Sequence, residues 1–360
     1  MGRNSKIRIW VGTRKGAFVF TSKDRKRWDC DGPFLAGQEV HHVAQDRREP
    51  RRLYAAGGTA WFGPHLHASA DGGKTWKLSE NGLEVKGIPD ATLKCIWHIA
   101  AGAEDEPGVI YLGGDPGVLF RSADHGANWE MVDGLCRHAS REKWTPGAGG
   151  MIVHSIQCLG QGRIIAGISA AGAFRTSDRG KTWEAFNGEV LADFLPEKYP
   201  PVGQCVHKLL AHPRNREALY QQNHCGVYRA GFTDKKWTDI SKGLPSRFGF
   251  ALTVPAAEEQ TLFTIPAVSP EHRFVPGGKL RVARSRNNGK TWKLLSKGLP
   301  QSNAYVLVLR EAMTSDDRDP AGVYFGTSTG TVFYTRDAGD SWHVMAQHLP
   351  PIYSVSAALH

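Results

Sequence analysis

The sequence lacks several features that would indicate a membrane, secreted or zinc-ribbon protein. It has no apolar run approaching the roughly 20 residues that a helix needs to cross a bilayer. Its six cysteines are scattered without a CxxC pair, which favours reduced thiols over a zinc ribbon or a disulfide framework. Residues Met1 to Ser5 run straight into the strand-like segment 6–11, leaving no room for the apolar core of a signal peptide. These absences predict a cytoplasmic protein with no membrane partner.

A concentrated basic region is also missing, although the formal net charge is +10. The 45 Lys and Arg residues occur mostly singly along the chain, whereas nucleic-acid-binding domains gather them on one face. The densest run, Arg47-Arg48 with Arg51-Arg52, surrounds Pro50 in an expected surface loop. We therefore expect no nucleic-acid partner.

Glycine and tryptophan are abundant, with 41 and 11 residues, and they recur in one phrase. A Ser or Thr is followed by Asp or Asn, then by Gly, then by a closing Trp. The five full copies are Ser69–Trp76, Ser122–Trp129, Thr176–Trp183, Ser285–Trp292 and Thr335–Trp342, and two eroded copies are Ser22–Trp28 and Thr233–Trp237. Successive closing tryptophans lie 48 to 55 residues apart. This period predicts an all-β, seven-bladed β-propeller that occupies residues 1–360 as a single domain.

The chemistry of the phrase is that of a turn. Asp accepts hydrogen bonds from backbone N–H groups, Gly adopts a positive φ, and Trp covers the hairpin. The phrase resembles the Asp-box, or BNR repeat, of sialidases, sortilin-type receptors, xyloglucan hydrolases and photosystem assembly factors. The resemblance implies a sialidase-like propeller whose boxes lie between the two outer strands of each blade, away from the ligand-binding face. Catalytic and non-catalytic proteins share the box, so it indicates architecture rather than activity.

Each repeat predicts four strands, and the two ends of the chain predict how the ring closes. In the second blade the strands are expected at 40–44, 52–56, 66–70 and 76–79. The first blade has candidates for three strands, at 6–11, 16–21 and 28–30, but none for its inner strand. The segment 349–355 matches the linker and inner strand of other blades, such as 299–308. We therefore expect the C-terminal strand to complete the first blade and to remove two open sheet edges.

Ligands of propellers usually bind at the mouth of the central channel, which the inner strands line. Equivalent positions of the seven expected inner strands can be compared. Their shared apolar position holds Val43, Ile96, Ile156, Leu209, Leu252, Val308 and Val355. Two residues earlier stand His41, Lys94, His154, His207, Phe250, Val306 and Tyr353. Four consecutive blades thus place an imidazole or ammonium group where an apolar residue is the norm. These groups either pack between blades or form donors for an anionic ligand. In the second case, protonation of the histidines below about pH 6.5 would strengthen binding of the anion.

Loops at the same end of the blades carry more polar and aromatic side chains. Trp61 is placed to stack on a sugar or another ring, and Asn223 with His224 offers directional hydrogen bonds. Long connections at 133–150 and 187–203, and an insertion at 266–278, are expected to be ordered. The predicted site has Asp115, His154 and His207 as catalytic candidates, and His41, Trp61, His65, Lys94, Gln204, Lys208, Asn223, His224, Arg273 and Tyr353 as ligand-binding candidates.

No metal or other cofactor is predicted. His154, His207 and His224 could meet one ion, but no local ligand spacing supports such a site. Cys225 next to His224 has the composition of a nucleophile and its base. A lone cysteine is, however, more often a small buried apolar residue.

The whole chain also resembles uncharacterised bacterial proteins labelled glycosyl hydrolases with BNR repeats, through Gln204–Lys208 and Gln222–Tyr228. The resemblance implies a glycosidase. True sialidase activity is not expected. Sialidases carry an Arg-Ile-Pro signature near the N-terminus, and the nearest counterpart here, Thr264-Ile265-Pro266, has Thr in place of Arg. Sialidase propellers also have six blades. A glycosidase needs two facing carboxylates. Asp115 is the best-placed acid, and no partner stands out among Glu39, Asp90 and Glu271.

Two functions therefore remain open from the sequence. One is a glycosyl-hydrolase-like propeller with a small anionic or carbohydrate-like ligand at the channel mouth. The other is a non-catalytic scaffold that binds a ligand or a protein partner. A monomer is expected in both cases.

Overall fold

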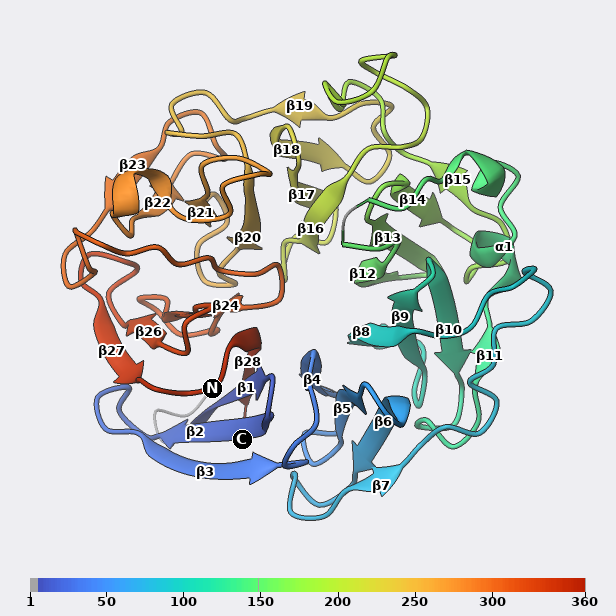
Figure 1. The fold of residues 1–360 in the computed structure, drawn as a ribbon, viewed down its shortest axis with the longest axis horizontal. Helices are drawn as coiled ribbons and strands as arrows, with labels where there is room; N and C mark the ends of the chain where they lie inside the picture. Colours follow the sequence, from blue (N-terminus) through green and yellow to red (C-terminus); the bar gives the residue numbers. More distant parts are fainter. Residues whose placement is uncertain (1–5, 148, 360) are drawn as a thin grey trace.

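The computed structural model describes residues 6–147 and 149–359, and these form seven four-stranded antiparallel sheets. The sheets surround a central axis as the blades of a propeller (Figure 1). The seven-bladed architecture predicted from the tryptophan period is confirmed. The segment Met1–Ser5, on which the expectation about a signal peptide rested, lies outside the described residues.

Each blade runs from an inner strand next to the axis to an outer strand at the rim (Figure 1). Blade 1 holds β28 (Ile352–Leu359), β1 (Ile7–Thr13), β2 (Gly16–Ser22) and β3 (Asp29–Phe34). Blade 2 holds β4 (His42–Gln45), β5 (Leu53–Thr59), β6 (Gly63–Ser69) and β7 (Lys77–Leu78). Blade 3 holds β8 (Cys95–Ala101), β9 (Ile110–Asp115), β10 (Val118–Ser122) and β11 (Glu130–Met131).

The remaining blades follow the same order. Blade 4 holds β12 (Val153–Gly160), β13 (Arg163–Ile168), β14 (Gly172–Thr176) and β15 (Glu184–Ala185). Blade 5 holds β16 (Val206–Ala211), β17 (Ala218–Asn223), β18 (Gly226–Gly231) and β19 (Thr238–Asp239). Blade 6 holds β20 (Gly249–Thr253), β21 (Leu262–Pro266), β22 (Val282–Ser285) and β23 (Lys293–Leu295), and blade 7 holds β24 (Met313–Ser315), β25 (Val323–Gly326), β26 (Val332–Thr335) and β27 (His343–Ala346).

Helical structure in the described residues is limited to one short α-helix and two 3₁₀ turns. These are α1 (Asp133–Cys136), η1 (Arg141–Lys143) and η2 (Pro276–Gly278), and they all belong to connections between strands. Within the described ranges, no helix is long and apolar enough to cross a membrane.

The C-terminal strand closes the ring in blade 1. β28 pairs antiparallel with β1 along its length, with Val355 opposite Val11. Ile352 and Val355 are buried in the same apolar cluster as Ile9 and Val11. The closure expected from the missing inner strand is thus confirmed, and it gives blade 1 the same four strands as the others.

The repeated phrase forms a tight turn between the third and fourth strands of a blade. Asp71 Oδ1 accepts hydrogen bonds from the backbone N–H groups of Lys74 and Thr75, both at 3.0 Å, and Oδ2 accepts one from the Thr75 hydroxyl at 2.6 Å. Gly73 has φ 88° and lies against the Trp10 ring, where a Cβ atom would be 2.7 Å from a ring carbon. Trp76 Nε1 donates to the Gly73 carbonyl at 3.1 Å. The phrase is therefore a structural element of each hairpin.

Blade 7 departs from the expected strand positions. Its inner strand is β24, whereas 305–308, expected to be that strand, has no strand structure. Leu307 instead exchanges hydrogen bonds with Ser328, and Val306 accepts one from the backbone of Val275. The expected inner-strand positions of Val306 and Val308 were therefore wrong, because connecting loops satisfy the backbone groups of this apolar segment.

The inner strands share an irregularity where they begin. One residue is left out of the pairing with the second strand in five blades, namely Trp97, His154, His207, Phe250 and Tyr353. In blade 2, His41 holds the same place, directly before the paired residue His42. These six side chains are called the mouth ring below. In blade 3 the register assigns Trp97 to the ring, so the expected position of Lys94 was wrong by three residues.

Candidate functional site

Planar side chains of the mouth ring stack on one another around the channel. His41 lies between Trp97 and Tyr353, with ring centroids 4.7 and 4.9 Å away, and His207 stacks on Phe250 at 4.4 Å. β-Bulges re-aim the side chain of the extra residue. The bulges thus turn these rings from the ordinary alternation of the strand toward neighbouring blades.

His154 has a structural environment. It is fully buried, its Nε2 donates to the Val206 carbonyl of the next blade at 2.7 Å, and its Nδ1 lies 3.1 Å from the Ser155 hydroxyl. Burial lowers the pKa of His154 well below its ordinary value, so the ring is neutral. Since both nitrogens are engaged within the protein, the geometry gives the predicted catalytic role of His154 no support.

Arg310, on the segment before β24, brings a positive charge into the middle of the mouth ring. Its guanidinium lies over the rings of Trp97 and Phe250, at 5.4 and 5.8 Å, and donates to the Ser169 hydroxyl at 2.9 Å. No ion pair of Arg310 with a carboxylate is found in the part of the chain that the structure describes. Burial lowers the pKa of Arg310, but a guanidinium keeps its proton in proteins. Arg310 is half-buried, and without a carboxylate partner its guanidinium keeps N–H donors that can hold an anion.

Arg310 lines a cavity of about 500 Å³ beside the starts of β16 and β20, called the mouth cavity below. Its aromatic walls are Phe194, Phe248 and Phe250, and its basic groups are Lys143, Arg273 and Arg310. His207, His224 and Cys205 also line it. Residues within 143–147, 149–150, 194–195, 202–205 and 270–273 contribute, so the long connections and the insertion singled out in the sequence do form its walls.

The hydrogen bonding of His207 determines which nitrogen faces the cavity. Its Nδ1 lies 2.6 Å from the Gly249 carbonyl, and a carbonyl only accepts, so Nδ1 carries the proton. Burial, followed by the charge of Arg310, lowers the pKa of His207 well below its ordinary value. The ring is thus neutral, with an unprotonated Nε2 that can accept a hydrogen bond or bind a metal.

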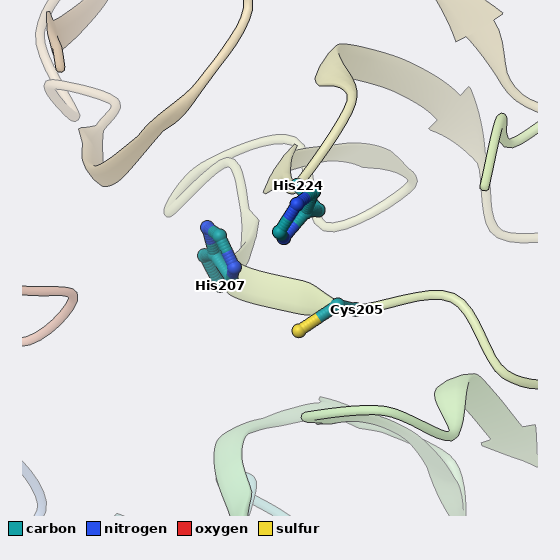
Figure 2. Close-up of side chains that lie close together, drawn as sticks. All are labelled: Cys205, His207 and His224. Carbon is teal, nitrogen blue, oxygen red and sulfur yellow. The ribbon is translucent and has the colours of Figure 1, made fainter. Parts of the chain in front are cut away.

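His224 and Cys205 lie next to His207 (Figure 2). The His224 ring is wedged between Phe194 and Phe248, with centroids 4.8 and 5.2 Å away. Its backbone N–H donates to the Cys205 carbonyl at 2.9 Å, which fixes the turn to the start of β16. Burial lowers the pKa of His224 and raises that of the Cys205 thiol.

The structure brings only some of the sequence-predicted residues into this cavity. His207, His224 and Arg273 line it. Gln204 and Asn223 are buried beside it and serve the backbone: the Gln204 amide donates to the Pro200 carbonyl at 2.5 Å, and Asn223 Oδ1 accepts from Cys225 N–H at 3.5 Å. These two amides shape the turn and the connection that carry the cavity walls.

Four further predicted residues belong to blades 2 and 3, and Tyr353 of blade 1 stacks on one of them, His41. His41 and Lys94 line a separate cavity of about 270 Å³, and burial lowers the pKa of His41 to about 4. His65 contacts the Glu80 carboxylate at 2.6 Å, and the Trp61 side chain is 91% exposed at the tip of its hairpin. The structure thus does not place Trp61 over the mouth cavity.

Asp115, a predicted catalytic residue, is half-buried next to the Met151 backbone. Burial raises its pKa, while the charge of Lys94 opposes the rise. Glu271 is the one carboxylate among the described residues that line the mouth cavity. It is exposed, and a hydrogen bond from Ser269 lowers its pKa. The described residues of this cavity do not provide the two carboxylates that a glycosidase needs as acid and nucleophile.

Deeper in the channel lies a buried ionic cluster that the sequence did not reveal. Lys208 Nζ is 2.6 Å from Glu311 Oε2, and both side chains are almost fully buried. His98 Nδ1 lies 3.4 Å from Oε1 and His42 Nε2 lies 4.0 Å from Oε2. Burial outweighs the carboxylate and lowers the pKa of His42 to about 3. Lys208 therefore serves as the counter-ion of Glu311 rather than reaching the mouth cavity.

Comparison with known proteins gives the class of fold, the β-propeller, but no family. No protein-family model matches the chain, and no curated protein matches its sequence. Among solved structures, the GH74 xyloglucanase from Xanthomonas campestris is similar, with a TM-score of 0.66 and 18% identity over 94% of this chain and 52% of that one. The chain thus spans about half the length of that enzyme.

Two further solved structures are similar over most of both chains. YCF48 bound to D1 peptide has a TM-score of 0.55 and 16% identity, covering 85% of this chain and 82% of that one. A putative 6-phosphogluconolactonase from Bacteroides fragilis has a TM-score of 0.54 and 12% identity, covering 99% of both chains. At these identities the likeness shows the propeller fold alone.

Proposed function

We propose that the protein binds a small organic anion in the mouth cavity. The observation that carries this proposal is Arg310, a guanidinium at the centre of the mouth ring that has no carboxylate partner in the described chain and lines a cavity. Its hydrogen bond to the Ser169 hydroxyl uses one N–H group, and the guanidinium has further N–H donors for a ligand. A carboxylate or phosphate matches such a fork through two parallel hydrogen bonds.

The rest of the cavity supports an anion with an apolar or planar body. Phe194, Phe248 and Phe250 offer ring surfaces, while Lys143 and Arg273 add positive charge at the same cavity. Ligand sites are typically apolar concavities with a few placed polar groups. The neutral His207 adds an acceptor nitrogen for a hydroxyl or N–H group of the ligand.

Binding without glycoside hydrolysis is the function that the geometry supports best. Retaining and inverting glycosidases both place two carboxylates across the substrate, whereas the mouth cavity has Glu271 alone among its described lining residues. The comparisons allow either function, since they include glycosidases and a peptide-bound propeller. We also propose, from the sequence, that the repeated turns are Asp-boxes of the BNR type and that the protein is a cytoplasmic monomer with one domain.

Isothermal titration of the full chain with inorganic phosphate, glucose 6-phosphate and benzoate tests the proposal. At least one anion is expected to bind, with neutral glucose as the control ligand. The Arg310→Met variant should weaken that binding by about tenfold or more, since hydrogen bonds to charged groups are worth about 1.5–3 kcal/mol. The matched control, Arg286→Met, changes an exposed arginine of blade 6 and should bind as the unaltered protein does. Equal affinity of the two variants would refute the site.

A further inference from the structure

We propose that Cys205, His207 and His224 form a zinc site with an open coordination position in the mouth cavity. Their ligand atoms, one sulfur and two imidazole nitrogens, all lie within 4.8 Å of one another. Figure 2 shows the Cys205 thiol and the rings of His207 and His224 close together around the start of β16 and the turn after β17. All three side chains line the mouth cavity, so a bound ion would be reachable from solvent.

Local backbone structure holds the three donors together. Cys205 directly precedes β16, His207 is the bulged residue near its start, and His224 lies in the turn between β17 and β18. The hydrogen bond from His224 N–H to the Cys205 carbonyl, 2.9 Å, ties the turn to the strand. One antiparallel pair with one bulge thus supplies the whole donor set, without a spacing that a sequence pattern would reveal.

His207 already has the outer contact that metal-binding histidines use. Its Nδ1–H donates to the Gly249 carbonyl at 2.6 Å, which fixes the tautomer and leaves Nε2 as the donor toward the cavity. Metal-ligating histidines almost always donate their other N–H in this way. Stacking on Phe250 at 4.4 Å further holds the ring in place.

The donor set selects the type of metal. One thiolate and two imidazoles suit Zn²⁺, whereas Mg²⁺ and Ca²⁺ take oxygen ligands. Three protein ligands leave the fourth tetrahedral position for an exogenous group. The described chain has two other clusters of this size, but in each a basic side chain already pairs with a carboxylate. Lys208 lies 2.6 Å from Glu311, and Arg48 lies 2.7 Å from Asp46.

Arg273 and Arg310 lie in the same cavity. Their charges repel a divalent ion, and an anion in the open position relieves that repulsion. This consequence rests on the proposed function: phosphate should tighten zinc binding, and zinc should tighten phosphate binding by the same factor.

The test is metal titration of the full chain after treatment with a chelator. Zinc chloride, competed against a chromophoric chelator, should bind at one ion per chain. Cobalt chloride should give tetrahedral d–d bands and a sulfur-to-cobalt charge-transfer band. Cys205→Ser should abolish the charge-transfer band, and Cys205→Ser, His207→Gln and His224→Gln should each weaken zinc binding by about 100-fold or more, at least the loss seen when an outer-shell partner is removed.

Matched variants keep the outcome decisive. Cys225→Ser changes a thiol that donates a hydrogen bond to Asp193 Oδ1, 3.0 Å away. His65→Gln changes a histidine that contacts Glu80. Both should bind zinc as the unaltered protein does. Circular dichroism checks that each variant is folded, and His224→Gln, at a half-buried turn, serves if His207→Gln unfolds. Absence of a stoichiometric ion, or cobalt binding that Cys205→Ser leaves unchanged, would overturn the zinc site.

The two proposals fail separately. The anion site is upheld, even if zinc does not bind, when the zinc-free protein binds phosphate and the Arg310→Met variant does not. The metal site is upheld, even if no anion binds to the zinc-free protein, when zinc binds in phosphate-free buffer and the Cys205→Ser variant loses that binding.

Discussion

Replacing Lys208 by methionine should destabilise the protein strongly, because it removes the counter-ion of a buried carboxylate. The Lys208 ammonium lies 2.6 Å from Glu311, and the two side chains are 7% and 3% exposed. The nearby His42 is neutral, since burial lowers its pKa to about 3, and it cannot replace the lost charge. Breaking a buried ion pair from one side costs about 3–5 kcal/mol, and we expect a loss of this size.

Chemical unfolding followed by circular dichroism measures the loss. The double variant Lys208→Met with Glu311→Leu should recover most of it, because an apolar pair of similar volume often equals a buried ion pair in stability. Lys23→Met, at an exposed lysine, is the control. A loss below about 1 kcal/mol, the value of an exposed pair, or additive losses in the double variant, would refute the view that Lys208 neutralises Glu311.

Three further predictions concern the ring and its turns. Removing β28 (352–359) should lower the thermal midpoint and promote oligomers, as measured by calorimetry and light scattering, because β1 loses its paired neighbour and becomes an open sheet edge. Asp71→Ala should lower the thermal midpoint while phosphate binding stays unchanged, since the lost contacts lie within a turn between β6 and β7. The Thr182 hydroxyl lowers the pKa of Asp178 from 3.8 to about 2. A lowered pKa adds stability above pH 3.8 that disappears as the pH falls toward 2, so acid titration followed by circular dichroism should show this loss, reduced in Asp178→Asn.

Most of the fold could be predicted from the sequence because each blade repeats one local turn. The closing tryptophans count the blades, and the missing first inner strand indicates the closure by β28. Prediction failed at blade 7, where 305–308 has the apolar composition of a strand but bonds to loops at Ser328 and Val275. Composition alone could not show this, because the partners that decide between strand and loop are remote in the sequence.

Because the inner strand of blade 7 was expected too early in the sequence, the charges of Arg310 and Glu311 were not recognised as belonging to the channel. Arg310 and Glu311 directly precede the true start of blade 7, and the alignment that placed Val306 at the mouth left them in a linker. Blade 3 was misaligned by three residues because Ile96 and Ile99 are both apolar and buried, and the register shows that Ile99, two residues after the bulge at Trp97, holds the shared position. The predicted residues that do line the mouth cavity are His207, His224 and Arg273. In blade 5 the alignment put His207 at the mouth, and the structure shows it there as the bulged residue of β16.

The structure also changes the source of positive charge at the mouth. The sequence suggested that imidazoles would attract an anion once protonated, below about pH 6.5. Burial lowers the pKa values of His41, His154 and His207, since an apolar ring of neighbours stabilises the neutral form. These rings therefore act as flat packing surfaces, and His207 keeps an unprotonated nitrogen toward the mouth cavity. The permanent charge belongs to Arg310, which the stacked rings hold in place at the channel mouth. An anion bound there would owe its affinity to the guanidinium. The same charge would repel the proposed metal ion, so the cavity would hold the two ligands best when both are bound.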